Sequence, residues 1–215
     1  MSKRVNNREI SKALNSLDIV YLLNIDDHFY HEYRDHSGDN FLISLITHAC
    51  KTKNEKPLLP SLIQRALEHG CSATESRGQG YYSAMEQALH SDKRDYLLNA
   101  LVEAGCDPNC VNTQKFSLLH AANTPEEIDC AIRLGANPQS IDSLGNSPIF
   151  YYFAGDIEYQ RISKLIDAGV DIDQKNHFGD SSIHNAIRAT KYYKSVERAY
   201  STSNRPDSHT DPNNL

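Results

Sequence analysis

The sequence predicts an all-α protein, built as a solenoid of stacked helix-turn-helix units with hairpin-like connectors. Three observations lead to this prediction. Four apolar, helix-like segments each end at a glycine, namely Gly70, Gly105, Gly135 and Gly169. A turn position follows ten residues after each of them, at Gly80, Lys115, Gly145 and Gly179. A unit of this size cannot bury its apolar face alone, so neighbouring units must stack into a shared core.

Composition places the chain among soluble globular proteins. It has 215 residues, 39% apolar and 23% charged, enough for one sizeable domain. The formal net charge is −6 without a block of like charges, which disfavours binding to nucleic acid. Five cysteines without a C-x-x-C pair favour reduced thiols in a cytosol. The polar N-terminus and the lack of a run of roughly 18 apolar residues predict neither a signal peptide nor a membrane span. We therefore expect a cytoplasmic protein.

The helical segments vary in spacing while the connector does not. In "DIEYQRISKLIDAG", Ile162 and Leu165 fall on one helix face, and Gly169 stands where a left-handed C-terminal cap is needed. "DKRDYLLNALVEAG" repeats the arrangement up to Gly105. The intervals between successive helix-ending glycines are 35, 30 and 34, from 105 − 70, 135 − 105 and 169 − 135. The constant ten-residue connector is therefore the geometrically constrained part of each unit.

These segments resemble ankyrin repeats. The stretches "NTQKFSLLHAA" (112–122), "DSLGNSPIFYYF" (142–153) and "NHFGDSSIHNAI" (176–187) are similar to the family's turn and first helix, D-x-x-G-x-T-P-L-H-x-A. "EAGCDPNC", "RLGANPQS" and "DAGVDIDQ" are similar to the end of its second helix, L-L-x-x-G-A-D-x-N. The resemblance covers roughly residues 35–190. Lys115 departs from the pattern by replacing the turn glycine, and "QGYYSAMEQ" lacks the T-P-L-H motif.

The window "DDHFYHEYRDHSGDN" (26–40) contains the first recognisable hairpin of the array, "DHSG". Counting ten residues back from Gly38 places His28 at the end of a preceding helix over 16–25. We therefore expect an N-terminal helical capping unit and connector over residues 1–34. An ankyrin-repeat array of about five units, the last of them degenerate, should follow over 35–200. The polar residues 201–215 are expected to be a disordered tail.

The first repeat carries an insertion, "KTKNEKPLLP" (51–60). Pro57 and Pro60 would break a helix there, and Pro60 is suited to the first turn of the next one. Solenoid loops accept insertions at little cost, so this segment is either tolerated variation or part of a binding face.

An alternative function is a metal-dependent enzyme or metal-binding protein that uses the 26–40 window. His28, His31 and His36, with Asp35 or Asp39, are proper ligands for Zn²⁺. However, the window contains no H-E-x-x-H motif, and a connector offers no rigid scaffold for ligands. We favour a protein that is not an enzyme and has no cofactor, metal or catalytic residue. The resemblance implies structural roles for His120 and His184, and buried packing roles for Cys71 and Cys106.

In ankyrin proteins, hairpin tips and first helices line a concave groove that binds other proteins. Carried over by register, the expected partner-binding residues are His36, Asp39, Gln79, Tyr81, Glu86, Gln114, Phe116, Ser143, Asn146, Tyr151, His177 and Asp180. Tyr81, Phe116 and Tyr151 are the aromatics expected to act as binding anchors. The alternative is that some of the three pack between repeats.

The leading hypothesis is a non-catalytic module that binds one partner protein through this groove and is monomeric when free. The short, degenerate repeats resemble those of bacterial ankyrin proteins. That group includes effectors delivered into host cells and proteins that neutralise a cognate toxin. The expected location is the cytoplasm, or a host cell in the effector case.

Overall fold

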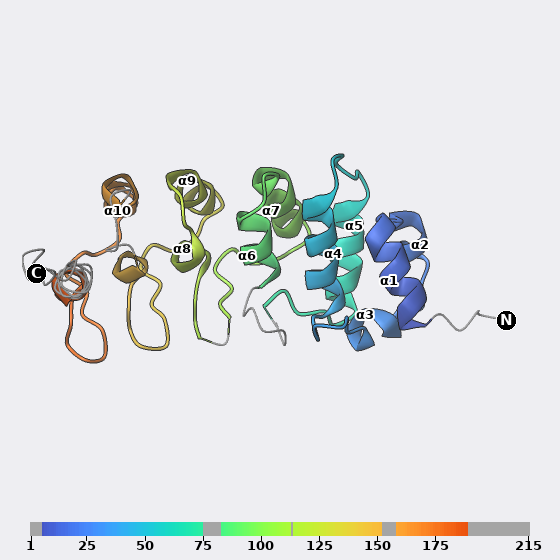
Figure 1. The fold of residues 1–215 in the computed structure, drawn as a ribbon, viewed down its shortest axis with the longest axis horizontal. Helices are drawn as coiled ribbons and strands as arrows, with labels where there is room; N and C mark the ends of the chain where they lie inside the picture. Colours follow the sequence, from blue (N-terminus) through green and yellow to red (C-terminus); the bar gives the residue numbers. More distant parts are fainter. Residues whose placement is uncertain (1–5, 75–82, 113, 152–157, 189–215) are drawn as a thin grey trace, which may run out of the picture.

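The structure is a computed structural model that describes residues 6–74, 83–112, 114–151 and 158–188. Figure 1 shows an elongated row of helices that advances steadily from the N-terminal to the C-terminal end. Within the described ranges, β structure is limited to two isolated bridges, Arg34 with Asn40 and Lys175 with Ser181. The predicted all-α solenoid is confirmed. None of the helices in the described part has the length and apolarity to cross a membrane.

The N-terminal unit differs from the prediction in its details. It consists of α1 (Asn7–Ser16), α2 (Ile19–Leu23) and α3 (His28–Glu32). The single helix expected over 16–25 is wrong, because Leu17 adopts a left-handed conformation with φ 47° and ends α1. The Asp18 carboxylate then caps α2 by accepting a hydrogen bond from the Tyr21 N–H at 3.1 Å. His28 begins a helix, whereas counting back from Gly38 placed it at a helix end.

Four repeats each supply a first and a second helix within the described residues, and a fifth supplies a first helix. The first helices are α4 (Phe41–Lys51), α6 (Ala84–Leu89), α8 (Leu118–Ala121), η1 (Pro148–Tyr151) and residues 182–188. The second helices are α5 (Leu59–Glu68), α7 (Arg94–Glu103), α9 (Pro125–Arg133) and α10 (Glu158–Asp167). Contacts run from α4 to α6, α8 and η1 in turn, and α5 packs on α7 as α9 does on α10. The first helix expected within 142–153 is present as a 3₁₀ turn, in which the Phe150 N–H bonds to the Ser147 carbonyl.

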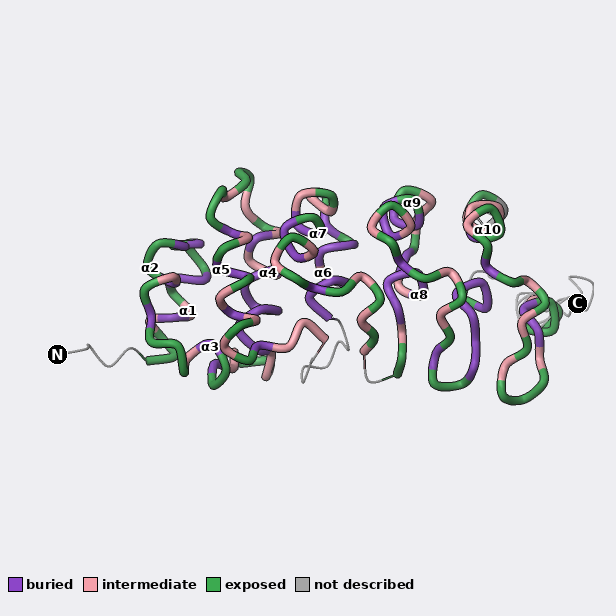
Figure 2. Tube along the Cα trace, turned by 180° about the vertical axis from the view of Figure 1, so that it is seen from behind, coloured by how far each residue is buried: buried purple, intermediate pink, exposed green. Residues whose placement is uncertain are grey.

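A continuous apolar strip joins these units. The second residue of each of α4, α6, α8 and η1 is buried, with 0% exposure at Leu42, Leu119 and Ile149 and 2% at Met85. Burial of each such side chain stabilises the array by about 1.5–3 kcal/mol relative to leaving it in water. Figure 2 shows this buried strip inside the row, with exposed residues at the hairpin ends.

The turn residues have the backbone conformation that their spacing predicts. The helix-ending glycines are all left-handed, from φ 89° at Gly70 to φ 98° at Gly105. Gly145 and Gly179 have φ 81°, and Lys115 adopts φ 59° in place of glycine. Glycine is favoured at such positions because it has no Cβ to clash with the adjoining carbonyl. Gly80 lies outside the described residues.

The cysteines belong to the packing of the repeats. Cys71 and Cys106 are 7% and 6% exposed, directly after helix-ending glycines, which confirms their predicted packing role. Burial raises the pKa of the Cys106 thiol to about 12. A thiol that stays protonated at neutral pH is a poor nucleophile.

Candidate functional site

Every described hairpin is closed by an Asp or Asn side chain at its base. Asp142 Oδ1 accepts hydrogen bonds from the Leu144 and Asn146 N–H groups at 2.8 and 2.9 Å. Asn176 Oδ1 does the same for the Phe178 and Asp180 N–H groups, both at 3.0 Å. Asp35 and Asn112 occupy this position in the other two described hairpins. These side chains satisfy backbone groups that would otherwise lack partners, so the hairpins have a defined shape.

Neighbouring hairpins are also joined to one another. The Ser143 N–H donates to the Gln114 carbonyl at 2.9 Å, and the His177 N–H donates to the Leu144 carbonyl at 2.9 Å. Figure 1 shows the hairpins projecting together from the lower edge of the row, on the side away from α7, α9 and α10. We call the surface formed by the hairpins and the first helices the hairpin face.

His120 links one repeat to the next within this face. Its Nδ1 accepts from the Ser117 N–H at 3.2 Å and lies 2.8 Å from Ser117 Oγ. That bond leaves the proton on Nε2, which donates to the Asn146 carbonyl of the following hairpin at 3.0 Å. Burial lowers the pKa of His120. His184 makes the same contact to Ser181 at 2.9 Å, so the structural roles predicted for both histidines are confirmed.

An aromatic cluster lies beside His120. The Phe116 ring is 5.0 Å from the Tyr151 ring and 5.2 Å from the His120 ring, centroid to centroid. Phe116 is half-buried, whereas Tyr151 is 43% exposed. The two alternatives left open for the aromatics therefore both apply, because Phe116 packs between repeats and Tyr151 reaches the surface. Tyr81, the third expected anchor, lies outside the described residues.

Hydrogen bonding sets the charge state of this cluster. The Tyr151 hydroxyl donates to Asp142 Oδ2, and Asn146 Nδ2 donates to the same oxygen at 3.0 Å. Burial, together with the hydrogen bond to Asp142, raises the pKa of Tyr151 to about 12. Burial by itself raises the pKa of the Asp142 carboxyl, but the hydrogen bonds from Tyr151 and Asn146 and from the Leu144 N–H outweigh it and lower that pKa. At neutral pH the site therefore holds an anionic, fully engaged carboxylate beside a neutral phenol.

A polar pocket of about 200 Å³ opens between the last two hairpins. It is lined by Asn146, Phe150, Tyr151, Asn176, Asp180, Asn185 and Arg188. Arg188 and Asp180 form a two-pronged ion pair, with N–O distances of 2.6 and 2.9 Å. Asn176 Nδ2 donates to Asn146 Oδ1 at 2.9 Å across the boundary between the repeats. The pocket is therefore polar and carries a paired carboxylate and guanidinium.

The predicted partner-binding residues fall into four groups. His36, Gln114, Ser143, Tyr151 and His177 are exposed, and Asp39, Phe116 and Asp180 are half-buried. The expectation of exposure is wrong for Glu86 and Asn146, which are 4% and 8% exposed. Glu86 belongs to a capping box and accepts from the Ser83 N–H at 2.7 Å. The Asn146 side chain donates a hydrogen bond to Asp142 and accepts one from Asn176. Gln79 and Tyr81 lie outside the described residues.

Two exposed apolar residues at the hairpin tips were missed by sequence reasoning. Leu144 is 48% exposed and Phe178 is 73% exposed, each two residues after the Asp or Asn at the base of its hairpin. The other described hairpins carry Ser37 and Gln114 at this position. The change from polar to apolar residues at this hairpin position can be read from the sequence and could have pointed to the two tips.

The 26–40 window has structural partners in place of an open ligand set. Asp27 forms an ion pair with Arg65 at 2.7 Å, and His31 Nδ1 lies 3.3 Å from the Gly70 carbonyl oxygen. The His28 ring packs 4.0 Å from the Phe29 ring. Across the described residues, no three His, Cys, Asp or Glu side chains are grouped so that they could hold a metal ion. Asp35 closes the first hairpin as described above.

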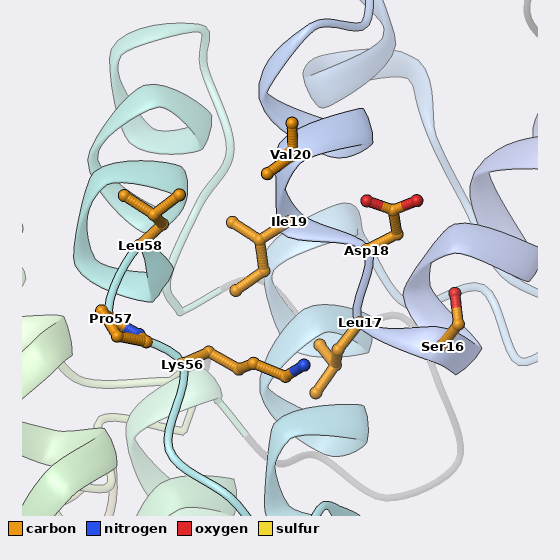
Figure 3. Close-up of a pocket in the computed structure, with 8 residues that line it drawn as sticks. All are labelled: Ser16, Leu17, Asp18, Ile19, Val20, Lys56, Pro57 and Leu58. Carbon is orange, nitrogen blue, oxygen red and sulfur yellow. The ribbon is translucent and has the colours of Figure 1, made fainter.

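A second pocket, of about 480 Å³, lies in the N-terminal part of the array and is drawn in close-up in Figure 3. It is formed where the bend between α1 and α2 meets the insertion loop, by Ser16, Leu17, Asp18, Ile19, Val20, Lys56, Pro57 and Leu58. The insertion loop is held in place by Tyr96, whose hydroxyl donates to the Lys56 carbonyl at 2.7 Å and accepts from the Lys56 N–H at 2.9 Å. This anchoring gives the insertion a fixed place against α7.

Comparisons with known proteins agree on the fold. No family model matches the chain. A sequence match to the glycerophosphocholine phosphodiesterase gde1 of Schizosaccharomyces pombe is 29% identical over 97 residues, which is 43% of this chain and only 8% of that protein. The ankyrin repeat domain of Bcl-3, a member of the IkappaB protein family, is 17% identical with a TM-score of 0.56, over 84% of this chain and 76% of that one.

A second solved structure matches over a longer share of both chains. It is a chain from the complex of the predatory endopeptidase Bd0816 of Bdellovibrio bacteriovorus with the immunity protein Bd3460. The match has a TM-score of 0.56 and 17% identity, over 89% of this chain and 95% of that one. With the paired helices and the row of bonded hairpins, these likenesses confirm the prediction: the chain is a repeat protein with the ankyrin-repeat fold.

Proposed function

We propose that the chain is a non-catalytic module that binds one partner protein on its hairpin face and is monomeric when free. The observation that carries this proposal is the row of hairpins bonded to one another at Gln114–Ser143 and Leu144–His177. A surface held in this way loses little conformational freedom when a partner docks, so more of the contact energy appears as affinity.

The side chains that could act as a general acid or base are engaged in structural hydrogen bonds, which supports a non-catalytic role. His120 is buried and its two ring nitrogens are both engaged, and Asp142 is held by Tyr151 and Asn146. A general acid or base needs a titratable atom that can reach a substrate. The similarity to gde1 covers only 8% of that protein, and no phosphodiesterase activity is proposed for this chain.

A finer version of the proposal concerns what binding achieves. One solved structure similar to nearly the whole chain comes from a complex of an endopeptidase with an immunity protein. That likeness favours a partner that is an enzyme held inactive, so we propose a toxin-neutralising role. Delivery into a host cell as an effector stays a prediction from the sequence.

The test is capture of partners from an extract of the source organism, with the purified chain immobilised. His36→Arg together with Gln114→Arg adds two charges to exposed positions of the hairpin face. The matched control, Asn99→Arg with Gln160→Arg, adds the same charges at exposed positions of α7 and α10. A partner retained by wild type and control but lost from the hairpin-face variant supports the proposal. Equal capture by both variants would contradict it.

The toxin-neutralising version needs a further measurement on the captured partner. If that partner is an enzyme, its activity should fall when the wild-type chain is added at equal concentration. The hairpin-face variant should leave the activity unchanged. A partner that stays fully active in the complex would remove this version while leaving the binding proposal intact.

A further inference from the structure

The tips of the last two described hairpins are apolar where the other two are polar. Leu144 and Phe178 are 48% and 73% exposed, and Ser37 and Gln114 occupy the same position in hairpins 35–39 and 112–116. We call Ser143, Leu144, His177 and Phe178 the tip ledge. Figure 1 shows these two hairpins next to each other at the C-terminal end of the row.

Contacts between the two hairpins hold the tip ledge together. The His177 N–H donates to the Leu144 carbonyl at 2.9 Å. The His177 side chain lies so close to Gly145 that an added Cβ would be 2.7 Å from its Cδ2 atom. Leu144 and Phe178 are therefore presented on backbones that are bonded to each other, which lowers the entropic cost of docking against them.

The carboxylates of these two hairpins already have partners within the chain. Asp142 is 2% exposed and bonded to Tyr151 and Asn146, and Asp180 is paired with Arg188. A basic group of a partner would lose hydration at the tip ledge, where the carboxylates of Asp142 and Asp180 are already engaged, whereas an apolar group would bury surface there.

We propose that the tip ledge is the anchor of the binding face, and that it receives an aliphatic or aromatic side chain from an uncharged segment of a partner protein. The adjoining pocket, with Asn146, Asn176 and Asn185, then faces the polar backbone of that segment. This inference rests on the proposed function and names the chemistry of the partner. Buried apolar anchors with a polar surround carry most of the affinity in protein interfaces.

The probe is a phage-displayed library of random peptides, selected on the immobilised full chain. Selected peptides should share an aliphatic or aromatic residue without charged neighbours. Leu144→Gln with Phe178→Ser introduces the two residues that the chain itself uses at this hairpin position. This double variant should raise the Kd of the peptides by about tenfold or more, because it removes the apolar contact surface.

The matched control is Ile141→Ser with Ile166→Ser, which removes two apolar side chains of 42% and 43% exposure outside the tip ledge. It should change the Kd less than about twofold. Thermal melts of both double variants by circular dichroism should match the wild type, since all four side chains are exposed.

Three results would overturn the inference. They are a charged peptide consensus, binding that the Leu144→Gln/Phe178→Ser variant leaves unchanged, and a wild-type dimer in light scattering that this variant dissociates. If His36→Arg/Gln114→Arg weakens binding of the peptides and the Leu144→Gln/Phe178→Ser variant does not, the hairpin face is the binding surface but the tip ledge is not its anchor. Peptides insensitive to both, or no selected peptides, would also contradict the proposed function.

Discussion

The third unit (112–135) and the fourth unit (142–169) build the same hairpin with different side chains. Both hairpins are closed by an Asp or Asn side chain, yet the turn residue is Lys115 at φ 59° in one and Gly145 at φ 81° in the other. Hydrogen bonds from backbone N–H groups to that side chain thus define the hairpin. The choice of turn residue affects strain and leaves the shape intact.

The first helices of these two units differ in how they join the next repeat. In the third unit, His120 bridges Ser117 and the Asn146 carbonyl. In the fourth unit, Phe150 replaces that histidine, and the buried Ser147 hydroxyl has no hydrogen-bond partner. The array thus tolerates the loss of a polar link between repeats, provided that the apolar core is continuous. The relative sizes of these two contributions can be measured.

The largest effect is expected in the core. Leu165 is fully buried in α10, and the third unit has Ala131 at the same position before its helix-ending glycine. Leu165→Ala should lower the free energy of unfolding by about 2–5 kcal/mol, because it leaves a cavity between stacked helices. Urea denaturation measures this change. Ile166→Ala, at a 43% exposed neighbouring position, should cost much less; equal losses would show that the position is not packed as described.

Gly145→Ala should have the next largest effect and lower the free energy of unfolding by about 1–3 kcal/mol. The new Cβ would meet His177 Cδ2 at 2.7 Å in a backbone conformation with φ 81°. Gly105→Ala is the matched control, because φ is 98° there and nothing lies within 4 Å of the new Cβ. The difference between the two variants in urea denaturation isolates the contact between hairpins. Equal losses in the two variants would mean that the His177 side chain moves away from the new Cβ without lowering the free energy of unfolding.

His120→Phe converts the third unit to the pattern of the fourth and should cost about 1–3 kcal/mol at pH 7.5, because Asn146 loses a bonded donor. Burial lowers the folded-state pKa of His120 below its unfolded value. The unfolded chain therefore binds the extra proton first, and this contribution to stability is complete above the unfolded pKa, about 6.5. It is lost as the pH falls from there toward the folded pKa.

Unfolding measured between pH 7.5 and 5 tests this dependence. His120→Phe should show a smaller loss of stability than the wild type across that range. Identical slopes for the two proteins would contradict the assigned burial of a neutral imidazole.

Ser147→Ala should be neutral or slightly stabilising, within about 1 kcal/mol, because it removes a buried hydroxyl that has no partner. Ser117→Ala should instead destabilise by about 1 kcal/mol or more, since Ser117 Oγ contacts His120 Nδ1 and Ser140 Oγ, both at 2.8 Å. Thermal melts of the two variants compare the units directly. A larger loss of stability for Ser147→Ala than for Ser117→Ala would contradict the assignment of an unpaired hydroxyl to Ser147.

Lys115→Gly should produce the smallest change, a stabilisation of less than about 1 kcal/mol. Glycine relieves the left-handed strain at φ 59° but increases the entropy of the unfolded chain, and the two effects partly cancel. The shift in melting temperature measures the sum. A clear destabilisation would show that the Lys115 side chain makes a contribution to the hairpin.

The spacing of the glycines was enough to predict the helix ends and the hairpin turns. The left-handed backbone at Gly105, Gly145 and Lys115 follows from it. The N-terminal unit was not predictable in this way, because its turn is made by Leu17, a residue without a turn preference. There the conformation is set by the capping of α2 and by packing, which spacing alone does not encode.

The places of the expected face residues in the hairpins and first helices were predictable by register, but their exposure was not. Glu86 and Asn146 stand at expected face positions, yet hydrogen bonds to Ser83 and to Asp142 draw them inward. Leu144 and Phe178 share the register position of Gln114 but were not among the residues carried over from the resemblance, and their exposure follows from the folded hairpins. Which polar side chain turns inward depends on partners in neighbouring repeats, and that is information about the assembled array.

Hydrogen exchange on the complex with the captured partner tests the central claim most directly. Binding on the hairpin face predicts slower exchange for backbone amides in 114–120, 142–151 and 176–185, with α7, α9 and α10 unchanged. Slower exchange confined to α7, α9 and α10, with the hairpins unaffected, would contradict it.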